Sequence, residues 1–122
     1  MPATAGFFGL TPLAKALTSE EGYRILERDA YCCQYCGLDG LAQFDNSLMM
    51  TVDFVVPRAR KGKKDPSNLV AACRSCNVIK GQRVFGNFDE AKAYVLQRRG
   101  ELRQDWENTV ARQHDKTHTA RR

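Results

Sequence analysis

Two apolar runs separated by a charged segment are the clearest pattern of hydrophobic and polar positions in the chain. Residues 49–56 read MMTVDFVV, are rich in β-formers, and are followed directly by a proline. Residues 68–72 read NLVAA and are short and apolar, as expected of a second strand. Residues 58–67, between the two runs, are charged and contain glycine and proline. The pattern therefore predicts two strands joined by a flexible charged loop.

Helical signals surround the two predicted strands. Thr18 and Glu21 match the S/T-x-x-E capping box, which predicts that a helix begins there. Residues 73–80 are typical of a short helix, and Gly81 would end it. A second capping pattern precedes a longer predicted helix over residues 89–111. Helices on either side of a pair of strands predict an α+β fold.

The remaining segments divide the chain into three predicted parts. Residues 18–111 hold the strands and helices and form one small domain, in which residues 38–47 are a loop. Residues 112–122 are polar and form a flexible tail. Residues 1–17 form an N-terminal arm that is disordered or docks on its own domain, with docking on a partner as the alternative. The apolar side chains of the arm are Phe7, Phe8 and Leu10.

Charge and targeting signals narrow the class of protein. The 122 residues carry 19 Lys and Arg against 14 Asp and Glu, for a formal net charge of +5. No run approaches the roughly 18 apolar residues of a membrane span, and the N-terminus lacks the basic start of a signal peptide. We therefore expect a cytoplasmic protein with no membrane partner.

The cations concentrate in the loop between the predicted strands. Such a cluster, directly after the predicted strand 49–56, favours contact with nucleic-acid phosphates over a merely solvated face. Two further cations on the following helix can extend the group. The candidate nucleic-acid-binding residues are Arg58, Arg60, Lys61, Lys63, Lys64, Arg74 and Lys80.

Five cysteines supply the most specific chemical signal. Two C-x-x-C pairs separated by 36 residues can bring four thiolates to one Zn²⁺ ion, at about 2.3 Å from each sulfur. A closed set of four cysteines leaves no open position, so this zinc is predicted to be structural. Disulfides are disfavoured in the cytoplasm, and the fifth cysteine, Cys32, is best explained as a small buried or half-buried residue. The predicted zinc ligands are Cys33, Cys36, Cys73 and Cys76.

The order of these motifs resembles the HNH endonuclease family. A C-x-x-C pair, the strand TVDFVVPR, a basic loop and the segment NLVAACRSCNVIKG follow one another within about residues 20–83. The resemblance implies a ββα-metal core in which Asp53 and Asn77 bind a catalytic Mg²⁺ or Mn²⁺ and Asn68 braces the loop. The alternatives are a solvated turn residue at the strand end for Asp53 and, for Asn77, a cap on the turn around the zinc cysteines. Asn68 is also a plain turn former, which is compatible with its bracing role.

One position departs from the family pattern. The family places a water-activating histidine directly after the metal-binding aspartate, and this chain has Phe54 there. A phenyl ring cannot accept a proton. The two histidines of the chain, His114 and His118, lie in the predicted tail, where we expect them to be exposed. The resemblance therefore predicts the scaffold of the family without its usual general base.

These residues leave three functions open. The favoured hypothesis is a nucleic-acid-binding protein, with DNA as the expected ligand, whose phosphodiester hydrolysis is reduced or lost. A metal-dependent endonuclease altered at the base position is the second. The third is a non-catalytic adaptor that binds a protein partner through the N-terminal arm or the long C-terminal helix.

Overall fold

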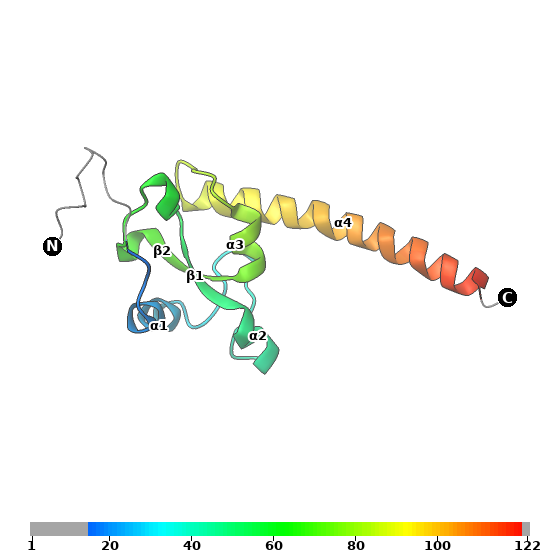
Figure 1. Ribbon diagram of the computed structural model, residues 1–122, viewed down its shortest axis with the longest axis horizontal. Helices are drawn as coiled ribbons and strands as arrows, with labels where there is room; N and C mark the ends of the chain where they lie inside the picture. The colour runs from blue at the N-terminus through cyan, green and yellow to red at the C-terminus, as the bar shows by residue number, and fades with distance from the viewer. Residues whose placement is uncertain (1–14, 121–122) are drawn as a thin grey trace.

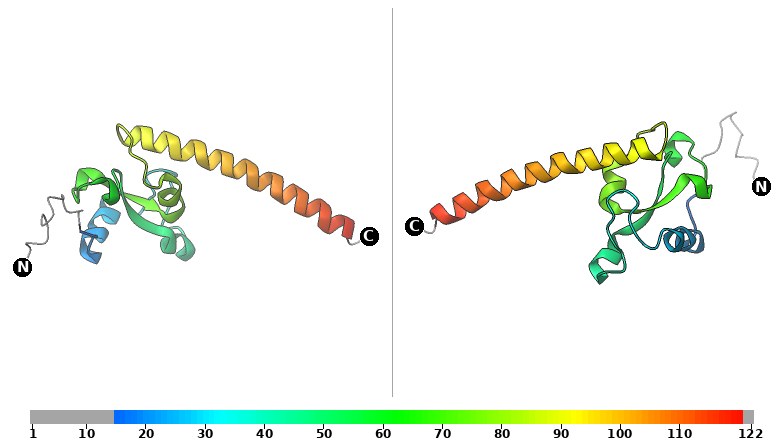
Figure 2. Two further views of the ribbon diagram at one scale, coloured as in Figure 1. Left: turned by 45° about the horizontal axis from the view of Figure 1, so that its top comes forward. Right: turned by 180° about the vertical axis from the view of Figure 1, so that it is seen from behind.

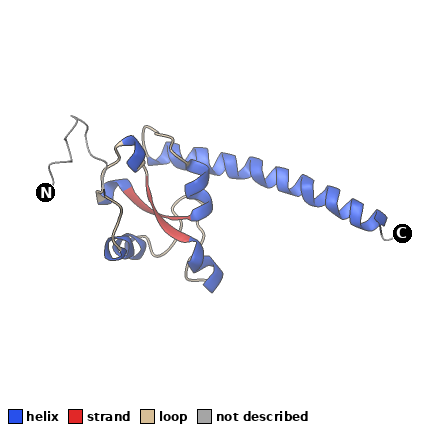
Figure 3. Ribbon diagram, in the orientation of Figure 1, coloured by secondary structure: helices blue, strands red, loops and turns tan. Residues whose placement is uncertain are grey.

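A two-stranded antiparallel sheet lies at the centre of the body of the molecule, with helices around it (Figure 1, Figure 3). The computed structural model describes residues 15–120, so the apolar residues predicted for the arm, Phe7, Phe8 and Leu10, lie outside the described residues. The described elements are α1 (Ser19–Arg28), α2 (Phe44–Met49), β1 (Met50–Phe54), the 3₁₀ helices η2 (Arg58–Arg60) and η3 (Pro66–Asn68), β2 (Leu69–Cys73), α3 (Arg74–Lys80) and α4 (Phe88–Ala120).

The helices pack around the sheet in a simple arrangement. α1 contacts both strands, α3 continues directly from β2, and α4 packs against α3. Two further views show that the distal part of α4 extends away from the body (Figure 2). Helices combined with a small antiparallel sheet confirm the predicted α+β fold. No described helix contains a stretch long and apolar enough to span a membrane.

Side-chain hydrogen bonds fix both ends of α1. Thr18 Oγ1 accepts from the backbone N–H of Glu21 at 3.1 Å, and Glu21 Oε1 accepts from the backbone N–H of Thr18 at 2.8 Å. This reciprocal pair is a capping box, so the predicted start of the helix is confirmed. At the other end, Asp29 Oδ2 accepts from the backbone N–H of Ala71 in β2 at 2.8 Å. α1 is thereby fastened to the sheet.

The buried core joins the first C-x-x-C pair to the sheet and to α4. Tyr35, Ala72 and Val95 are buried in one cluster with three of the cysteines. The ring of Tyr35 also contacts that of Phe88, with 5.1 Å between the ring centroids. The core therefore adjoins the cysteine cluster and does not form a separate layer.

α2 was not expected from the sequence. It begins inside the segment 38–47, whose Gly, Asp, Asn and Ser content predicts a loop. The side chain of Asn46 donates to the backbone oxygen of Asp39 at 3.0 Å, and this contact folds a single helical turn back onto the loop. The prediction was wrong here because loop-forming residues can also stabilise one short turn.

α4 is longer than the sequence pattern indicates. The predicted helix ends at Ala111, whereas α4 continues to Ala120, into the segment predicted as a flexible tail. Asn87 Oδ1 caps its start by accepting from the backbone N–H of Glu90 at 2.9 Å. Pairs of opposite charge one turn apart stabilise the middle of the helix, before the extension begins. They are Arg98–Glu101 and Arg103–Glu107.

The segment between the strands is compact, although the sequence predicts a flexible loop. The backbone oxygen of Pro57 accepts from the N–H groups of Arg60 and Gly62, at 2.8 and 2.9 Å. Gly62 is buried, and a Cβ atom there would lie 1.7 Å from the backbone oxygen of Val56. The loop therefore closes tightly on its own base and requires glycine at position 62.

We expect Gly62→Ala to lower the free energy of unfolding by about 1–3 kcal/mol, because the backbone must shift to admit the methyl group. Urea denaturation followed by circular dichroism measures the loss. Gly100→Ala is the matched control, because a Cβ atom at this helical position meets nothing within 4 Å. The control should keep its stability and gain helix content. Equal destabilisation of both variants would contradict this account of the loop.

Candidate functional site

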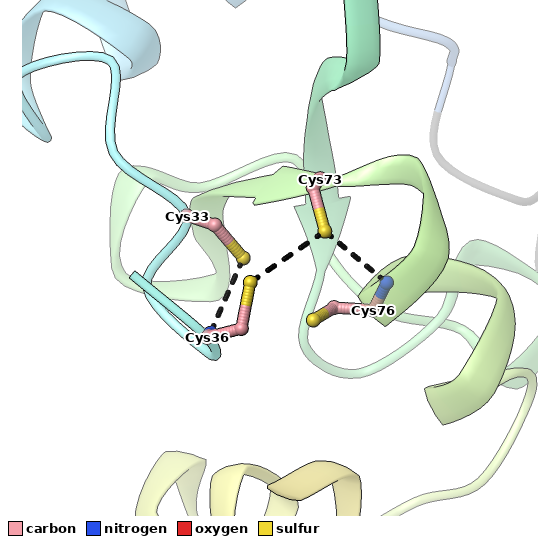
Figure 4. A group of neighbouring side chains, drawn as sticks. All are labelled: Cys33, Cys36, Cys73 and Cys76. Carbon is pink, nitrogen blue, oxygen red and sulfur yellow. Dashed lines mark hydrogen bonds between the residues drawn. The ribbon is translucent and has the colours of Figure 1, made fainter. Parts of the chain in front are cut away.

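Four cysteines converge between the first C-x-x-C pair and the start of α3 (Figure 4). Their Sγ atoms all lie within 4.8 Å of one another, and Cys36 Sγ lies 3.8 Å from Cys73 Sγ. Four sulfurs about 2.3 Å from one tetrahedral ion lie roughly 3.8 Å apart. All five cysteines of the chain are free thiols. The cluster fits a structural metal such as zinc, with ligands Cys33, Cys36, Cys73 and Cys76.

Backbone donors point at the sulfur atoms and favour the thiolate form. The N–H of Cys36 lies 3.5 Å from Cys33 Sγ, and the N–H of Cys76 lies 3.4 Å from Cys73 Sγ. A hydrogen bond with Cys76, assisted by backbone N–H groups, lowers the pKa of Cys33 to about 4. The same hydrogen bond raises the pKa of Cys76. These hydrogen bonds therefore favour the thiolate, the form that binds metal, at Cys33, whereas burial raises the pKa of Cys36.

Arg99 brings a positive charge from α4 to the cluster. Its Nη1 lies 3.6 Å from Cys76 Sγ, and the residue is half-buried. Four thiolates around one divalent ion carry a net charge of about −2. The guanidinium group offsets part of that charge and links α4 to the cysteine cluster through Cys76.

Tyr35 connects the cysteine cluster to the sheet. It lies between Cys33 and Cys36, is 1% exposed, and donates from its hydroxyl group to Asp53 Oδ2 in β1. Burial, followed by the charge of Asp53, raises the pKa of Tyr35, so the phenol stays protonated and remains a donor. The turn formed by residues 33–36 thus positions one oxygen of the Asp53 carboxylate.

Lys80 contacts the other oxygen of the same carboxylate. Its Nζ lies 3.4 Å from Asp53 Oδ1, with side chains 0% and 4% exposed, respectively. The ammonium group also donates to the backbone oxygens of Phe54 and Val55, at 3.2 and 3.1 Å. Burial raises the pKa of Asp53, while Tyr35 and Lys80 oppose that rise. Asp53 is therefore held on both oxygens by protein groups.

A surface pocket of about 350 Å³ opens beside this carboxylate. Asp53, Phe54 and Asn77 all line it, so the structure brings the three predicted site residues together. Phe54 also lines the neighbouring pocket between α1 and β1, and the guanidinium of Arg58 lies 5.9 Å from its ring centroid. His114 is exposed on α4 and does not line the pocket.

The residues of this pocket, as they are placed, do not fit the divalent metal that the resemblance implies. Mg²⁺ and Mn²⁺ take oxygen ligands, mainly carboxylates together with waters. Among the described residues that line the pocket, Asp53 is the only carboxylate, and Lys80 and Tyr35 already engage both of its oxygens. Asn77 can add only a neutral oxygen. The charges of Asp53 and Lys80 sum to zero.

Asn68 ties the end of β1 to the loop that follows it. Its Oδ1 accepts from the N–H of Val56 at 2.8 Å, and its Nδ2 donates to the backbone oxygens of Val56 and Lys63 at 3.1 and 3.0 Å. The side chain therefore uses both ends of its amide to hold the loop.

Some of the predicted nucleic-acid-binding cations are exposed, and others pair with acidic side chains. Arg60, Lys61 and Lys63 are exposed on the loop, and Arg74 is exposed on α3. Lys64 Nζ donates to Glu21 Oε1 at 2.7 Å, which links the loop to α1. Lys80 must be removed from the predicted nucleic-acid-binding set, because it is fully buried beneath the pocket.

The region that holds the cysteine cluster and the pocket is similar in sequence to a known family. Residues 33–83 match the family model described as HNH endonuclease. This segment belongs to the HNH endonuclease family. The HNH segment contains both C-x-x-C pairs, both strands and α3, so the predicted resemblance is confirmed.

One curated relative is similar over the same region. It is the CRISPR-associated endonuclease Cas9 of Corynebacterium diphtheriae, which is 41% identical over 64 residues. That stretch is 52% of this chain, and the chain spans only 5% of the length of the relative. No solved structure matches the chain. The similarity to this relative therefore concerns the HNH segment, and nothing about the rest of Cas9 is transferred to this chain.

Sequence reasoning did not find three of the contacts that shape the HNH segment. The hydroxyl of Tyr35, the ammonium of Lys80 and the guanidinium of Arg99 each reach a site residue from another element. An aromatic residue inside the first C-x-x-C pair was the one visible signal for Tyr35. The pairings of Lys80 and Arg99 depend on how α3 and α4 pack, and no local pattern encodes that.

We expect Arg99→Ala to speed the release of the metal bound by the four cysteines, because it removes the cation nearest Cys76. The rate is measured with a chromogenic chelator under native conditions. Arg98→Ala is the matched control, since Arg98 is an exposed neighbour that pairs with Glu101. Equal release rates for the two variants would show that Arg99 does not support the cluster.

Proposed function

We propose that this chain is an HNH-type nucleic-acid-binding protein, with DNA as its favoured ligand, whose phosphodiester hydrolysis is reduced or lost. Phe54 carries the proposal, because it lies in the pocket beside Asp53 at the position of the family's general base. Neither histidine nor glutamate lines the described pocket to replace it. General-base catalysis contributes about 10²–10⁴-fold, or roughly 3–5 kcal/mol of barrier.

The metal requirements support the same proposal. The four cysteines hold Zn²⁺ as a structural ion, because a closed tetrahedral thiolate set suits zinc and leaves no position for substrate. Five free thiols also suit a reducing compartment such as the cytoplasm. The Mg²⁺ or Mn²⁺ expected at Asp53 and Asn77 does not enter the proposal, because Lys80 and Tyr35 engage Asp53.

Binding is proposed to use the cations of the loop and of α3. Arg58 lines the pocket, Arg60, Lys61 and Lys63 are exposed on the same loop, and Arg74 is exposed on α3. The loop backbone loses little entropy on binding, since Asn68 and Gly62 already order it. Contacts of this kind bind phosphate and carry little sequence information.

An adaptor function is the second candidate, and α4 favours it. The distal part of this helix extends away from the body (Figure 1), and it carries three large apolar side chains that are exposed. They lie one turn apart and are Leu102, Trp106 and Val110, which are 38%, 58% and 45% exposed. Tryptophan is enriched in the energetic centres of protein interfaces. This helix is the surface on which a protein partner would bind.

We expect the zinc-loaded protein to nick supercoiled plasmid no faster than Asp53→Ala, with either Mg²⁺ or Mn²⁺ present. The reason is that the pocket lacks a base to activate water. Agarose-gel quantification of open circles measures the rate. Strong nicking by the unmodified protein that Asp53→Ala abolishes would contradict the proposed loss of hydrolysis. Phe54→His then locates the defect: nicking by this variant assigns it to the base alone, and continued inactivity assigns it to the carboxylate as well.

We expect a triple variant of the exposed loop cations, Arg60→Ala, Lys61→Ala and Lys63→Ala, to bind duplex DNA more weakly and with less salt dependence. The slope of log affinity against log salt should fall in magnitude by about 2–3, near 0.9 for each lost phosphate contact. Fluorescence anisotropy over a salt series measures it.

A charge-matched control separates location from net charge. Arg98→Ala, Arg112→Ala and Lys116→Ala remove three exposed cations from α4. This control should leave the slope nearly unchanged. Equal losses in both triple variants, or binding that ignores salt, would favour the adaptor function.

A further inference from the structure

Lys80 is a buried cation next to Asp53, which lines the candidate pocket. It is the last residue of α3, is 0% exposed, and directs its ammonium group toward the end of β1. A buried lysine needs a compensating charge and acceptors for its hydrogens. Its surroundings therefore show what the ammonium group does.

Three acceptors surround the ammonium group of Lys80. They are Asp53 Oδ1 at 3.4 Å and the backbone oxygens of Phe54 and Val55 at 3.2 and 3.1 Å. An ammonium group has three hydrogens, so each finds a partner. The side chain is enclosed and cannot swing into solvent without leaving all three acceptors unpaired. Its positive charge is therefore held against Asp53, which lines the pocket.

The carboxylate of Asp53 has no oxygen left without a protein partner. Lys80 contacts Oδ1, and the Tyr35 hydroxyl donates to Oδ2. The remaining charged residue that lines the described pocket is Arg58, which is also cationic. A divalent ion entering here would meet the buried charge of Lys80, the charge of Arg58 and one carboxylate that Lys80 already pairs. The repulsion from Lys80 is weakly screened because that charge is buried.

We propose that Lys80 keeps divalent cations out of the Asp53–Asn77 pocket in the free protein. The ammonium group takes the place of the cation as the partner of the carboxylate and holds the end of β1 against α3 at the same time. The inference rests on the proposed assignment of Asp53 and Asn77 to one pocket, and it does not depend on nucleic-acid binding.

Binding of Mn²⁺ to the zinc-loaded full chain, in the absence of nucleic acid, tests this inference. Electron paramagnetic resonance reports free Mn²⁺, and zinc keeps the thiolates because it binds them more tightly than manganese does. The unmodified protein should leave the free-Mn²⁺ signal as it is in buffer. Lys80→Met, which keeps the length of the side chain and removes its charge, should bind Mn²⁺ at least about tenfold more tightly.

Two controls assign any binding to the pocket. Lys80→Met combined with Asp53→Asn should return to the level of the unmodified protein, because the carboxylate is gone. Asn77→Ala on the Lys80→Met background should weaken the gained binding. A folded Lys80→Met variant that binds Mn²⁺ no better than the unmodified protein would overturn the proposal.

The test survives a folding failure. Removing one partner of a buried ion pair can unfold a small domain, and circular dichroism detects this. The titration of the unmodified protein is then decisive. Mn²⁺ binding by that protein, abolished by Asp53→Asn, would overturn the exclusion and leave the proposed DNA binding intact. No binding by either form, with the chain folded, supports the exclusion.

Discussion

The convergence of four sulfur atoms is the constraint on which the rest of this structure depends. Two cysteines come from a knuckle before the sheet and two from the junction of β2 and α3, and their Sγ atoms lie within 4.8 Å of one another. A small domain buries too little apolar surface to be held by its core alone. The cluster therefore sets where the knuckle, the sheet and α3 lie, and it places Tyr35 against Asp53.

A polar core extends from this constraint into the candidate pocket. Tyr35 and Lys80 contact the carboxylate of Asp53, and Lys80 also donates to the backbone oxygens of Phe54, the last residue of β1, and Val55, which follows it. Replacing Tyr35 or Lys80 by an apolar residue would lower the free energy of unfolding, because the partner left behind would be buried and unpaired. The scaffold and the reactive chemistry are thus separable. The network keeps the pocket in shape, while Phe54 leaves it without a base.

The outer elements connect to the same centre through charge. Glu21 in α1 pairs with Lys64 in the loop, and Arg99 in α4 reaches Cys76. Farther along α4, Trp106 is exposed. The exposed cations of the HNH segment and the exposed apolar side chains of α4 therefore belong to different elements.

The sequence alone determined the features that local pattern and spacing encode. Two C-x-x-C pairs predicted the metal cluster, a capping box predicted the start of α1, and ordered motifs predicted the family. That Phe54 replaces the general base stays a prediction from the resemblance. Only the tertiary structure decided how charges pair across elements. A sequence shows that Lys80 is basic, which favoured an exposed phosphate contact, but burial converts it into the partner of Asp53. The physical reason is that the state and role of a charge depend on its solvation and neighbours, which distant segments supply.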